Sequence, residues 1–258
     1  VTIARDAEQL AEVVSEFEAA GLKLHAYVGD LADMASAEAV TQQVLAEHGV
    51  VDILINNAGR SIRRAIENSF DRFHDFERTM QLNYFGALKV SMGVLPKMIE
   101  QKHGHIINIS SIGVLTNAPR FSAYVASKSA LDAWTRCAAS EFADRGINFT
   151  TINMPLVKTP MIAPTKLYDQ VPTLTPEEAA ALICDAVIHR PVRVATRLGI
   201  TGQVLHALVP RVAQIIMNTT FRMFSDSSAA KKKEAGLLPE IPSADQVAFQ
   251  QFMRGIYF

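Results

Sequence analysis

Cysteine is scarce in this chain. Cys137 and Cys184 are the only two in 258 residues, and they lie far apart. The absence of C-x-x-C spacing excludes a disulfide scaffold and a cysteine-based zinc site. We therefore expect both cysteines to be packing residues, in a protein of the reducing cytoplasm.

An excess of charge and a long uncharged apolar run are also missing. The chain has 25 Lys and Arg against 26 Asp and Glu, so no overall field attracts nucleic acid or an anionic surface. No run of eighteen apolar residues is free of charge, and the N-terminus has no basic-then-apolar signal. The sequence therefore predicts neither a nucleic-acid partner, a membrane-spanning helix nor secretion, and function must come from a local site.

The thirteen glycines form no phosphate-binding motif. Neither G-x-x-x-G-x-G nor G-x-G-x-x-G occurs, so the glycine turn that normally opens a dinucleotide-binding domain is absent. The chain starts with the strand-like run VTIARD and without Met. We expect that further residues precede this run.

What is present is an alternation of short apolar runs and amphipathic helices. With 49% hydrophobic residues, the chain can bury the core of one large domain. Strands are expected at residues 1–5, 22–30, 51–59, 105–111 and 147–155, and helices at 7–21, 36–49, 69–102 with a break near Pro96, 122–145 and 175–190. Asp6 and Thr175 are the expected N-caps of two of these helices. The alternation predicts an α/β fold with a doubly wound parallel sheet.

The C-terminal part has a different pattern. Residues 201–224 are apolar and amphipathic around Pro210, and a polar stretch follows. We expect residues 1–200 to form the α/β body and residues 201–258 to form appended helices of the same domain. Lys231, Lys232 and Lys233 follow this amphipathic segment, which could lie on a membrane or line an acyl tunnel. We favour the third interpretation, a solvated polar linker behind a docked helix.

The stretch FSAYVASKSALDAW places Tyr124 and Lys128 on one face of a predicted helix, four positions apart. Such pairs are common on helices, so the spacing alone is weak evidence for a catalytic role. Ser111, however, ends an apolar strand thirteen residues earlier, and Asn83 lies in the preceding helical region. Ligands of parallel sheets bind at the carboxyl ends of the strands, where Ser111 and residues 56–59 emerge. The alternative is a buried tyrosine, a partly buried lysine and a serine that caps a turn.

These motifs resemble the short-chain dehydrogenase/reductase family. NNAG, the Asn of QLNYFG, a Ser thirteen residues before the Tyr, and Y-x-x-x-K occur in the order and spacing of that family between residues 1 and 159. The resemblance implies a Rossmann-like fold, a nicotinamide cofactor and a homo-oligomer built on the long helices. It also implies catalytic roles for Asn83, Ser111, Tyr124 and Lys128, with Asn83 holding a water that links the lysine to solvent.

The chemistry of these residue types suits that assignment. A free phenol has a pKa of about 10 and is a poor proton donor or acceptor near neutrality. A nearby lysine cation favours the phenolate, so we expect Tyr124 to exchange a proton with the substrate oxygen, assisted by Lys128. Ser111 is expected to donate a hydrogen bond to the same oxygen as that oxygen gains charge.

The choice of cofactor depends on the residues after the first predicted strand. Arg5 favours the 2′-phosphate of NADPH, whereas Asp6 could hold a free ribose hydroxyl or only cap the helix. The resemblance implies further cofactor contacts by Asp30, Leu31, Asn57, Ala58, Gly59, Pro155, Val157 and Thr159, besides Tyr124 and Lys128. It also implies that the strand bearing the glycine turn is missing from the centre of the sheet. Leu156 departs from the Pro-Gly of the family.

More narrowly, the chain is similar to bacterial reductases that convert long-chain fatty acyl thioesters to aldehydes with NADPH. The segments HDFERTMQLNYFG, NISSIGVLTNAPRFSAY and MPLVKTPMIAPTKLY carry this similarity. It implies a lipid substrate, an acyl thioester or an aldehyde, and a place in lipid metabolism. Two alternatives remain, a general alcohol or ketone dehydrogenase and a non-catalytic fragment that has lost its cofactor.

A metal site is not expected. His103 and His105 flank a glycine before a strand, but no third ligand lies nearby in the sequence. We interpret this H-x-H pair as part of a turn.

Overall fold

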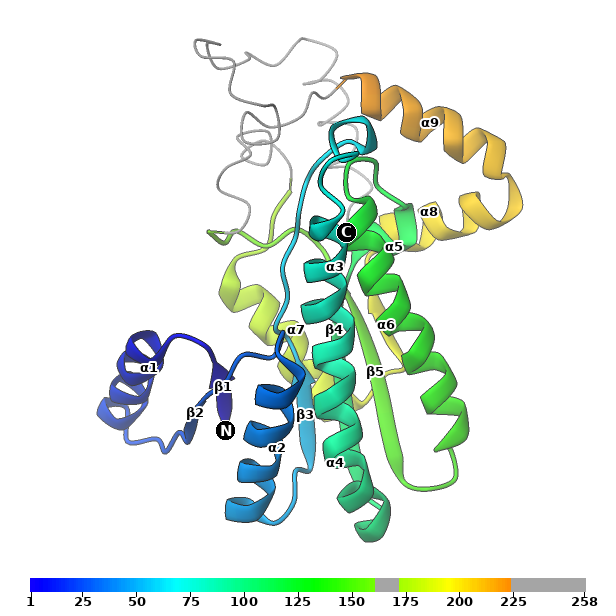
Figure 1. Cartoon of the computed structure of the whole chain (residues 1–258). Helices are drawn as coiled ribbons and strands as arrows, with labels where there is room; N and C mark the ends of the chain where they lie inside the picture. Colours follow the sequence, from blue (N-terminus) through cyan, green and yellow to red (C-terminus); the bar gives the residue numbers. More distant parts are fainter. Residues whose placement is uncertain (161–171, 224–258) are drawn as a thin grey trace.

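The computed structural model describes residues 1–160 and 172–223. Within these ranges, strands and helices alternate along the chain (Figure 1). The strands are β1 Thr2–Ala4, β2 Ala26–Val28, β3 Ile53–Asn56, β4 Gly104–Ser111, β5 Ile147–Met154 and β6 Arg193–Ala195. The helices are α1 Ala7–Ala19, α2 Met34–His48, η1 Ile66–Asn68, α3 His74–Met80, the π-helical η2 Gln81–Gly86, α4 Ala87–Gln101, α5 Ile112–Thr116, α6 Ser122–Glu141, α7 Pro176–His189, α8 Arg197–Leu208 and α9 Pro210–Met223.

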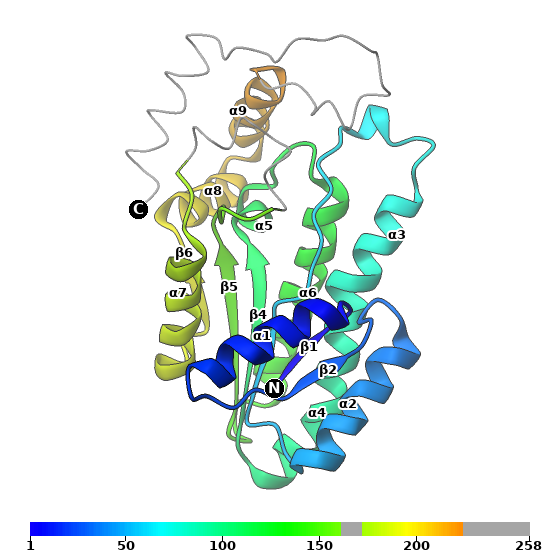
Figure 2. The same cartoon turned by 90° about the vertical axis from the view of Figure 1, so that its left-hand side faces the viewer.

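The strands form parallel sheets with helices on both faces. The larger sheet has the order β3-β4-β5-β6, and β1 pairs only with β2. Figure 2 shows α7 on one side of the larger sheet and α4 and α6 on the other. The predicted doubly wound α/β fold is therefore confirmed.

The sheet is interrupted where the family resemblance placed a gap. In the part of the chain that the structure describes, no strand joins β1 to β3, and Figure 1 shows the β1–β2 pair apart from the larger sheet. Ile53 and Ile55 of β3 are 42% and 41% exposed. The neighbouring β4 is almost completely buried. The free edge of β3 therefore leaves apolar side chains uncovered at the centre of the fold.

Two hydrophobic clusters hold the larger sheet between its helices. Ile106 and Phe149 pack with Val94 and Met98 of α4, whereas Ile107 and Ile152 pack in a separate cluster with residues of α7. Ile106 and Ile107 are consecutive residues of one strand, so they point to opposite faces. This arrangement explains why β4 is apolar throughout rather than alternating.

Both predicted helix caps are present. The Asp6 side chain accepts hydrogen bonds from the backbone N–H groups of Glu8 and Gln9. Thr175 and Glu178 form a reciprocal capping box at the start of α7. Such caps typically contribute about 1 kcal/mol each, and they fix where α1 and α7 begin.

The helical region between β3 and β4 corrects one prediction. The expected break near Pro96 is wrong, since α4 runs through this proline without interruption. The backbone carbonyl that loses its partner belongs to Met92, which lies on the exposed face of the helix where water can replace the bond. The irregularity lies instead at η2, where one turn is π-helical.

The prediction that both cysteines are packing residues is also wrong. Cys137 of α6 and Cys184 of α7 are exposed. Ala138 and Ala186, one and two positions further on, are the buried residues of these turns. Successive helical residues are rotated by about 100°, so the sequence neighbours of a buried position face solvent.

The appended helices α8 and α9 follow β6 and extend the predicted fold. Residues 224–258, including Lys231 to Lys233, lie outside the described part of the chain. Among the described residues, no helix combines the length and the apolar composition that crossing a membrane requires.

Candidate active site

The predicted catalytic residues meet at the carboxyl end of β4. Ser111 is the last residue of β4 and the N-cap of α5. Tyr124 and Lys128 occupy the first two turns of α6, which packs on β4 and β5. Asn83 lies in η2, which also packs on α6. Three separate elements therefore bring the four side chains to one place.

The side chains of Tyr124 and Ser111 interact at the end of β4, since Ser111 influences the pKa of the Tyr124 phenol. The hydroxyl of Ser111 also accepts a bond from the backbone N–H of Gly113, at 3.1 Å. Burial raises the pKa of the Tyr124 phenol, and the interaction with the Ser111 side chain offsets part of this rise. The capping role of Ser111 thus coexists with a contact to the phenol, and one interaction does not exclude the other.

Lys128 is buried, with 4% of its surface exposed. Its Nζ donates a hydrogen bond of 2.6 Å to the backbone carbonyl of Ile109. Burial lowers the pKa of this ammonium to about 8. The ammonium is therefore anchored to β4, and it loses its proton far more readily than an exposed lysine does.

Asn83 is completely buried and makes three hydrogen bonds. Its Oδ1 accepts from the backbone N–H of Arg60 at 2.8 Å, and its Nδ2 donates to the Arg60 carbonyl and to Ser127 Oγ at 2.9 Å each. Ser127 in turn donates to the Tyr124 carbonyl. A π-helical turn often marks a functional position, and here it directs Asn83 toward the helix that bears Tyr124 and Lys128.

A further polar network behind the site was not predicted from the sequence. The amide of Asn56 donates to Ser91 Oγ at 2.9 Å and to Asn108 Oδ1 at 2.7 Å, and Asn108 donates to Thr135 at 2.8 Å. These buried bonds connect β3, β4, α4 and α6. The sequence signal for this network is an Asn within each of the two apolar strands. A buried amide requires hydrogen-bond partners, so each Asn indicates a polar contact inside the fold.

Asn153 of β5 is another residue that the sequence reasoning missed. It is 1% exposed, and its Nδ2 donates to the backbone carbonyl of Ser111 at 3.3 Å. The contact links the end of β5 to Ser111.

The residues expected at the adenosine end of a cofactor lie at the ends of β1 and β2. Arg5 and Asp30 form an ion pair at 3.9 Å, and the Arg5 side chain is 66% exposed. Asp6 caps α1, so the structure assigns it the capping role. Leu31 packs on the small cluster of Tyr27, Val40 and Val44.

The residues expected near the nicotinamide follow β3 and β5. Asn57 and Ala58 are exposed, whereas a Cβ on Gly59 would lie 3.2 Å from Asn83 Oδ1 and 3.3 Å from Lys128 Nζ. After β5, Pro155 is buried, Val157 forms a bridge with Leu174, and Thr159 is partly buried. These groups suit the two ends of a dinucleotide. The described residues contain no glycine turn for its pyrophosphate.

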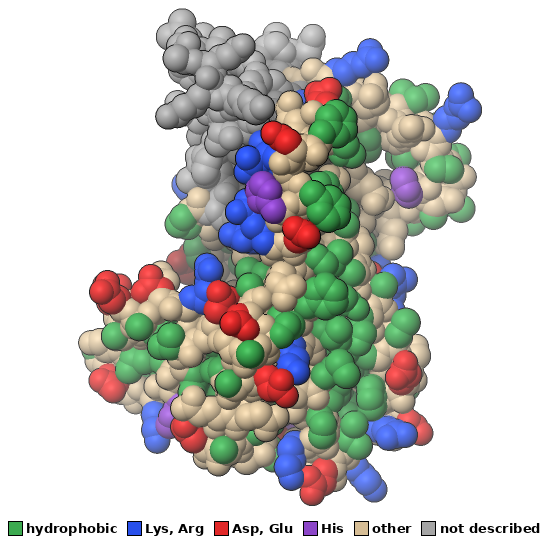
Figure 3. Space-filling model, in the orientation of Figure 1, with side chains coloured by type: hydrophobic (Ala, Val, Ile, Leu, Met, Phe, Trp, Pro, Cys, Tyr) green, Lys and Arg blue, Asp and Glu red, His purple; other side chains and the backbone are tan. Residues whose placement is uncertain are grey.

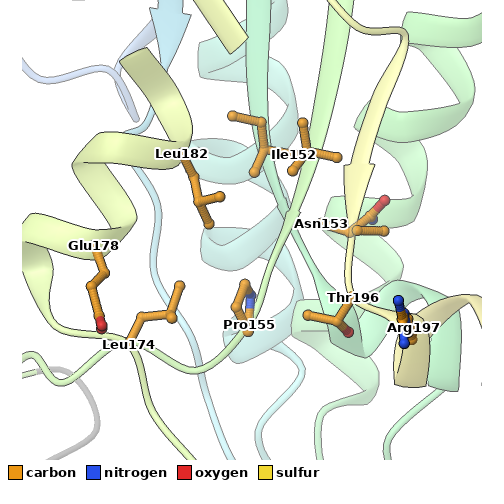
Figure 4. Close-up of a pocket in the computed structure, with 10 residues that line it drawn as sticks. Ile152, Asn153, Pro155, Leu174, Glu178, Leu182, Thr196 and Arg197 are labelled. Carbon is orange, nitrogen blue, oxygen red and sulfur yellow. The ribbon is translucent and has the colours of Figure 1, made fainter. Parts of the chain in front are cut away.

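A cavity of about 370 Å³ lies beside the loop after β5 (Figure 4). Ile152, Pro155, Leu174, Leu182 and Val194 supply most of its apolar wall, between α7 and the ends of β5 and β6. Thr196, Arg197 and Glu178 stand at its polar margin. The cavity can therefore hold an apolar group next to a loop expected to contact the cofactor.

His105 corrects the interpretation of the H-x-H pair as a turn. The residue lies within β4, is 2% exposed, and its Nε2 is 2.9 Å from Thr150 Oγ1. Burial, with a smaller contribution from Arg190, lowers the pKa of the imidazole to about 4. Within the described ranges no group of His, Cys, Asp and Glu could hold a metal ion.

Comparison with known proteins places this geometry in context. A sequence profile for short chain dehydrogenases matches residues 1–168. Over 228 residues the chain is 55% identical to a fatty acyl-CoA reductase of Acinetobacter baylyi, an alignment that covers 88% of this chain and 77% of that protein.

Solved structures show the same fold. A short-chain dehydrogenase from Streptomyces avermitilis superposes with a TM-score of 0.70 and 27% identity, covering 85% of this chain and 87% of that one. A metagenomic short-chain oxidoreductase in complex with NADP superposes with a TM-score of 0.55 and 30% identity, covering 60% of this chain and 68% of that one.

Proposed function

Because the chain belongs to the short-chain dehydrogenase family of oxidoreductases, we propose that it reduces long-chain fatty acyl thioesters to aldehydes with NADPH. The observation that carries the proposal is the cluster at the end of β4, where Ser111 and Tyr124 interact beside the buried Lys128 and Asn83. The substrate class rests on the 55% identity to a fatty acyl-CoA reductase.

NADPH is the proposed cofactor because of Arg5. Its exposed guanidinium is paired with Asp30 only at 3.9 Å, and exposed pairs of this kind contribute little. The guanidinium can therefore turn toward a 2′-phosphate, which it would hold by charge-assisted hydrogen bonds. A relative of 30% identity binds NADP. Leu31 would contact the adenine, and residues 57–59 and 155–159 would lie near the nicotinamide, which supplies the hydride when bound.

Tyr124 is the proposed proton donor. As the carbonyl oxygen of the substrate gains negative charge, the phenol gives it a proton and Ser111 donates a hydrogen bond to it. Lys128 stabilises the phenolate that Tyr124 leaves behind, and Asn83 fixes the backbone around Arg60 against the same helix. Removal of an oxyanion-type donor such as Ser111 typically lowers the rate about a hundredfold to a thousandfold. We therefore assign to Ser111 about 3 kcal/mol of transition-state stabilisation.

With a thioester substrate, hydride adds to the carbonyl carbon and the oxygen takes the Tyr124 proton, which gives a hemithioacetal. As the carbon–sulfur bond breaks, the hydroxyl proton returns to the Tyr124 phenolate and the departing thiolate takes a proton from solvent. The products are the aldehyde and the free thiol of coenzyme A. The apolar cavity beside Pro155 supports a lipid substrate, since each buried methylene adds about 0.8 kcal/mol to binding.

We also propose that the protein is a homo-oligomer. Phe85 and Met92 are exposed on η2 and α4. Figure 3 shows a column of hydrophobic side chains down this flank of the molecule. A large uncovered apolar patch of this kind marks an interaction surface.

The proposal is tested with the protein as its gene encodes it, supplied with NADPH and palmitoyl-CoA. We expect palmitaldehyde and free thiol in equal amounts, and Tyr124→Phe should lower the rate by about a hundredfold or more. Tyr27→Phe is the matched control, because this tyrosine bonds to Glu47 in a different part of the fold. A near-normal rate in Tyr124→Phe contradicts the assignment of the proton donor. Turnover of a secondary alcohol but not of palmitoyl-CoA contradicts the substrate class alone.

A further inference from the structure

The helical hairpin α8–α9 exposes an apolar surface to solvent. Of 21 large hydrophobic side chains exposed in the described parts of the chain, seven lie within residues 197–223. We call this the hairpin surface, and it consists of Ile200, Val204, Leu208, Val209, Val212, Ile215 and Ile216. Figure 1 shows α9 projecting from the body of the molecule.

The spacing of these residues makes each helix two-sided. Ile200, Val204 and Leu208 recur every four residues and form one stripe along α8. Val212 and Ile216 repeat the same spacing on α9. The buried positions are Gly199 on α8 and Ala213 on α9. On α9, Val212 and Ile216 lie beside the buried Ala213 and Ile215 lies on the opposite side, so the uncovered apolar residues begin at the border of the face that meets the protein.

The charge of the hairpin is of one sign. Residues 197–223 contain three arginines and one histidine but no Asp or Glu, although the whole chain has 26 acidic residues. Arg211 and Arg222 lie four and seven residues from Ile215, so all three share a side of α9. Figure 3 shows hydrophobic and basic side chains together on this part of the molecule. Apolar residues beside arginines are typical of helices that lie in a lipid interface, where the guanidinium reaches the headgroups.

We propose that the hairpin surface docks on an anionic lipid bilayer, with both helices lying in the headgroup region. A second copy of the chain is a poorer partner. Pairing two hairpins by a two-fold axis would bring arginines together with no acidic residue on either hairpin to neutralise them.

The hairpin is attached to both segments that carry the site. Its helix α8 packs tightly on α5, which begins directly after Ser111, and a Cβ on Gly199 would lie only 2.8 Å from Leu115. On α9, the Phe221 carbonyl accepts a 3.0 Å bond from Arg120, whose guanidinium lies 4.0 Å from the Phe221 ring centre. Arg120 is four residues before Tyr124. Docking therefore places the site beside the lipid phase, from which long-chain substrates partition.

The experiment is co-sedimentation of the protein, as encoded, with vesicles of phosphatidylcholine and phosphatidylglycerol, compared with phosphatidylcholine alone. Substrate is omitted, so the result does not depend on the proposed reductase activity. We expect binding to the anionic vesicles and a loss of about tenfold or more in Ile215→Glu. Ile188→Glu on α7 is the matched control, because Ile188 is 71% exposed and Ile215 is 62% exposed. The paired change Arg211→Gln and Arg222→Gln should weaken binding to anionic vesicles and reduce its salt dependence.

Circular dichroism and thermal melting establish that each variant is folded. Absence of binding by the unchanged protein overturns the proposal, and so does an equal loss in Ile188→Glu. If Ile215→Glu lowers the mass of the particle in solution while vesicle binding is unaffected, the hairpin surface is an interface between copies, and the proposal is again wrong.

Discussion

Lys128→Met should change how stability depends on pH, because Lys128 carries its charge in a buried position. Burial lowers the pKa of the ammonium from 10.5 to about 8. Between these values the unfolded chain binds more protons than the folded chain, so the free energy of unfolding rises with pH across this window. The difference of 2.5 corresponds to about 3 kcal/mol, which is the cost of keeping the ammonium protonated in the fold below pH 8.

Urea unfolding of the protein and of Lys128→Met, from pH 7.5 to pH 10.5, measures this cost. The unchanged protein should gain about 3 kcal/mol relative to the variant as the pH rises, because methionine has no proton to lose. At pH 7.5 the free energy of unfolding of the variant is also lowered by the loss of the 2.6 Å hydrogen bond to the Ile109 carbonyl. The change with pH is therefore the quantity to compare.

Lys89→Met supplies the baseline for removing a lysine. Lys89 is on the surface, paired with Glu38 at 2.8 Å. If the curves of Lys128→Met and of the unchanged protein run parallel over the whole range, the ammonium of Lys128 is not destabilised by burial. The account of its role beside Tyr124 would then have to be abandoned.

The remaining predictions concern acid stability, packing and the cofactor. Between pH 6.5 and pH 4, His105→Gln should lose about 3 kcal/mol less stability than the unchanged protein. Burial lowers the pKa of His105 to about 4, so the unfolded chain takes up this proton before the folded chain does, and the unchanged protein loses stability as the pH falls. Urea midpoints that change equally with pH in both proteins would contradict this prediction. Gly86→Ala should lower the free energy of unfolding by about 1–3 kcal/mol or more in thermal melting, because the added Cβ would lie 2.1 Å from the Leu31 carbonyl oxygen. Gly202→Ala should lower it less, because its Cβ would lie 3.0 Å from a Thr116 methyl group. The reverse order would refute the packing argument. Arg5→Ala should weaken NADPH binding far more than NADH binding in fluorescence titrations of the protein as encoded, and an equal loss for both would show that Arg5 is structural.

Much of the fold could be predicted because its signals are local. Apolar runs and helical periodicity depend on neighbouring residues, and they were sufficient to predict the parallel α/β fold. The caps at Asp6 and Thr175 involve residues two and three positions apart, and both are present. Tyr124 and Lys128 share a helical face for the same reason, so their proximity in α6 needed no tertiary information.

The remaining features required contacts between distant segments. Helix α4 can continue through Pro96 because the carbonyl of Met92, which loses its hydrogen bond there, lies on the exposed face of the helix. The exposure of Cys137 and Cys184 depends on which side of each helix meets the sheet. No local pattern encodes these outcomes, because burial is fixed only when helix and sheet pack together.

The candidate site divides in the same way. The sequence by itself determined the residue types, Asn83, Ser111, Tyr124 and Lys128, and their order along the chain. Only the tertiary structure decided that Lys128 donates to the Ile109 carbonyl and that Asn83, from a π-helical turn, holds the backbone of Arg60. It also decided the buried bond between Asn56 and Asn108, which are 52 positions apart. A hydrogen bond between residues so far apart in sequence forms only after the sheet has brought both partners together. Burial in that fold strengthens such bonds, and it also lowers the pKa of Lys128.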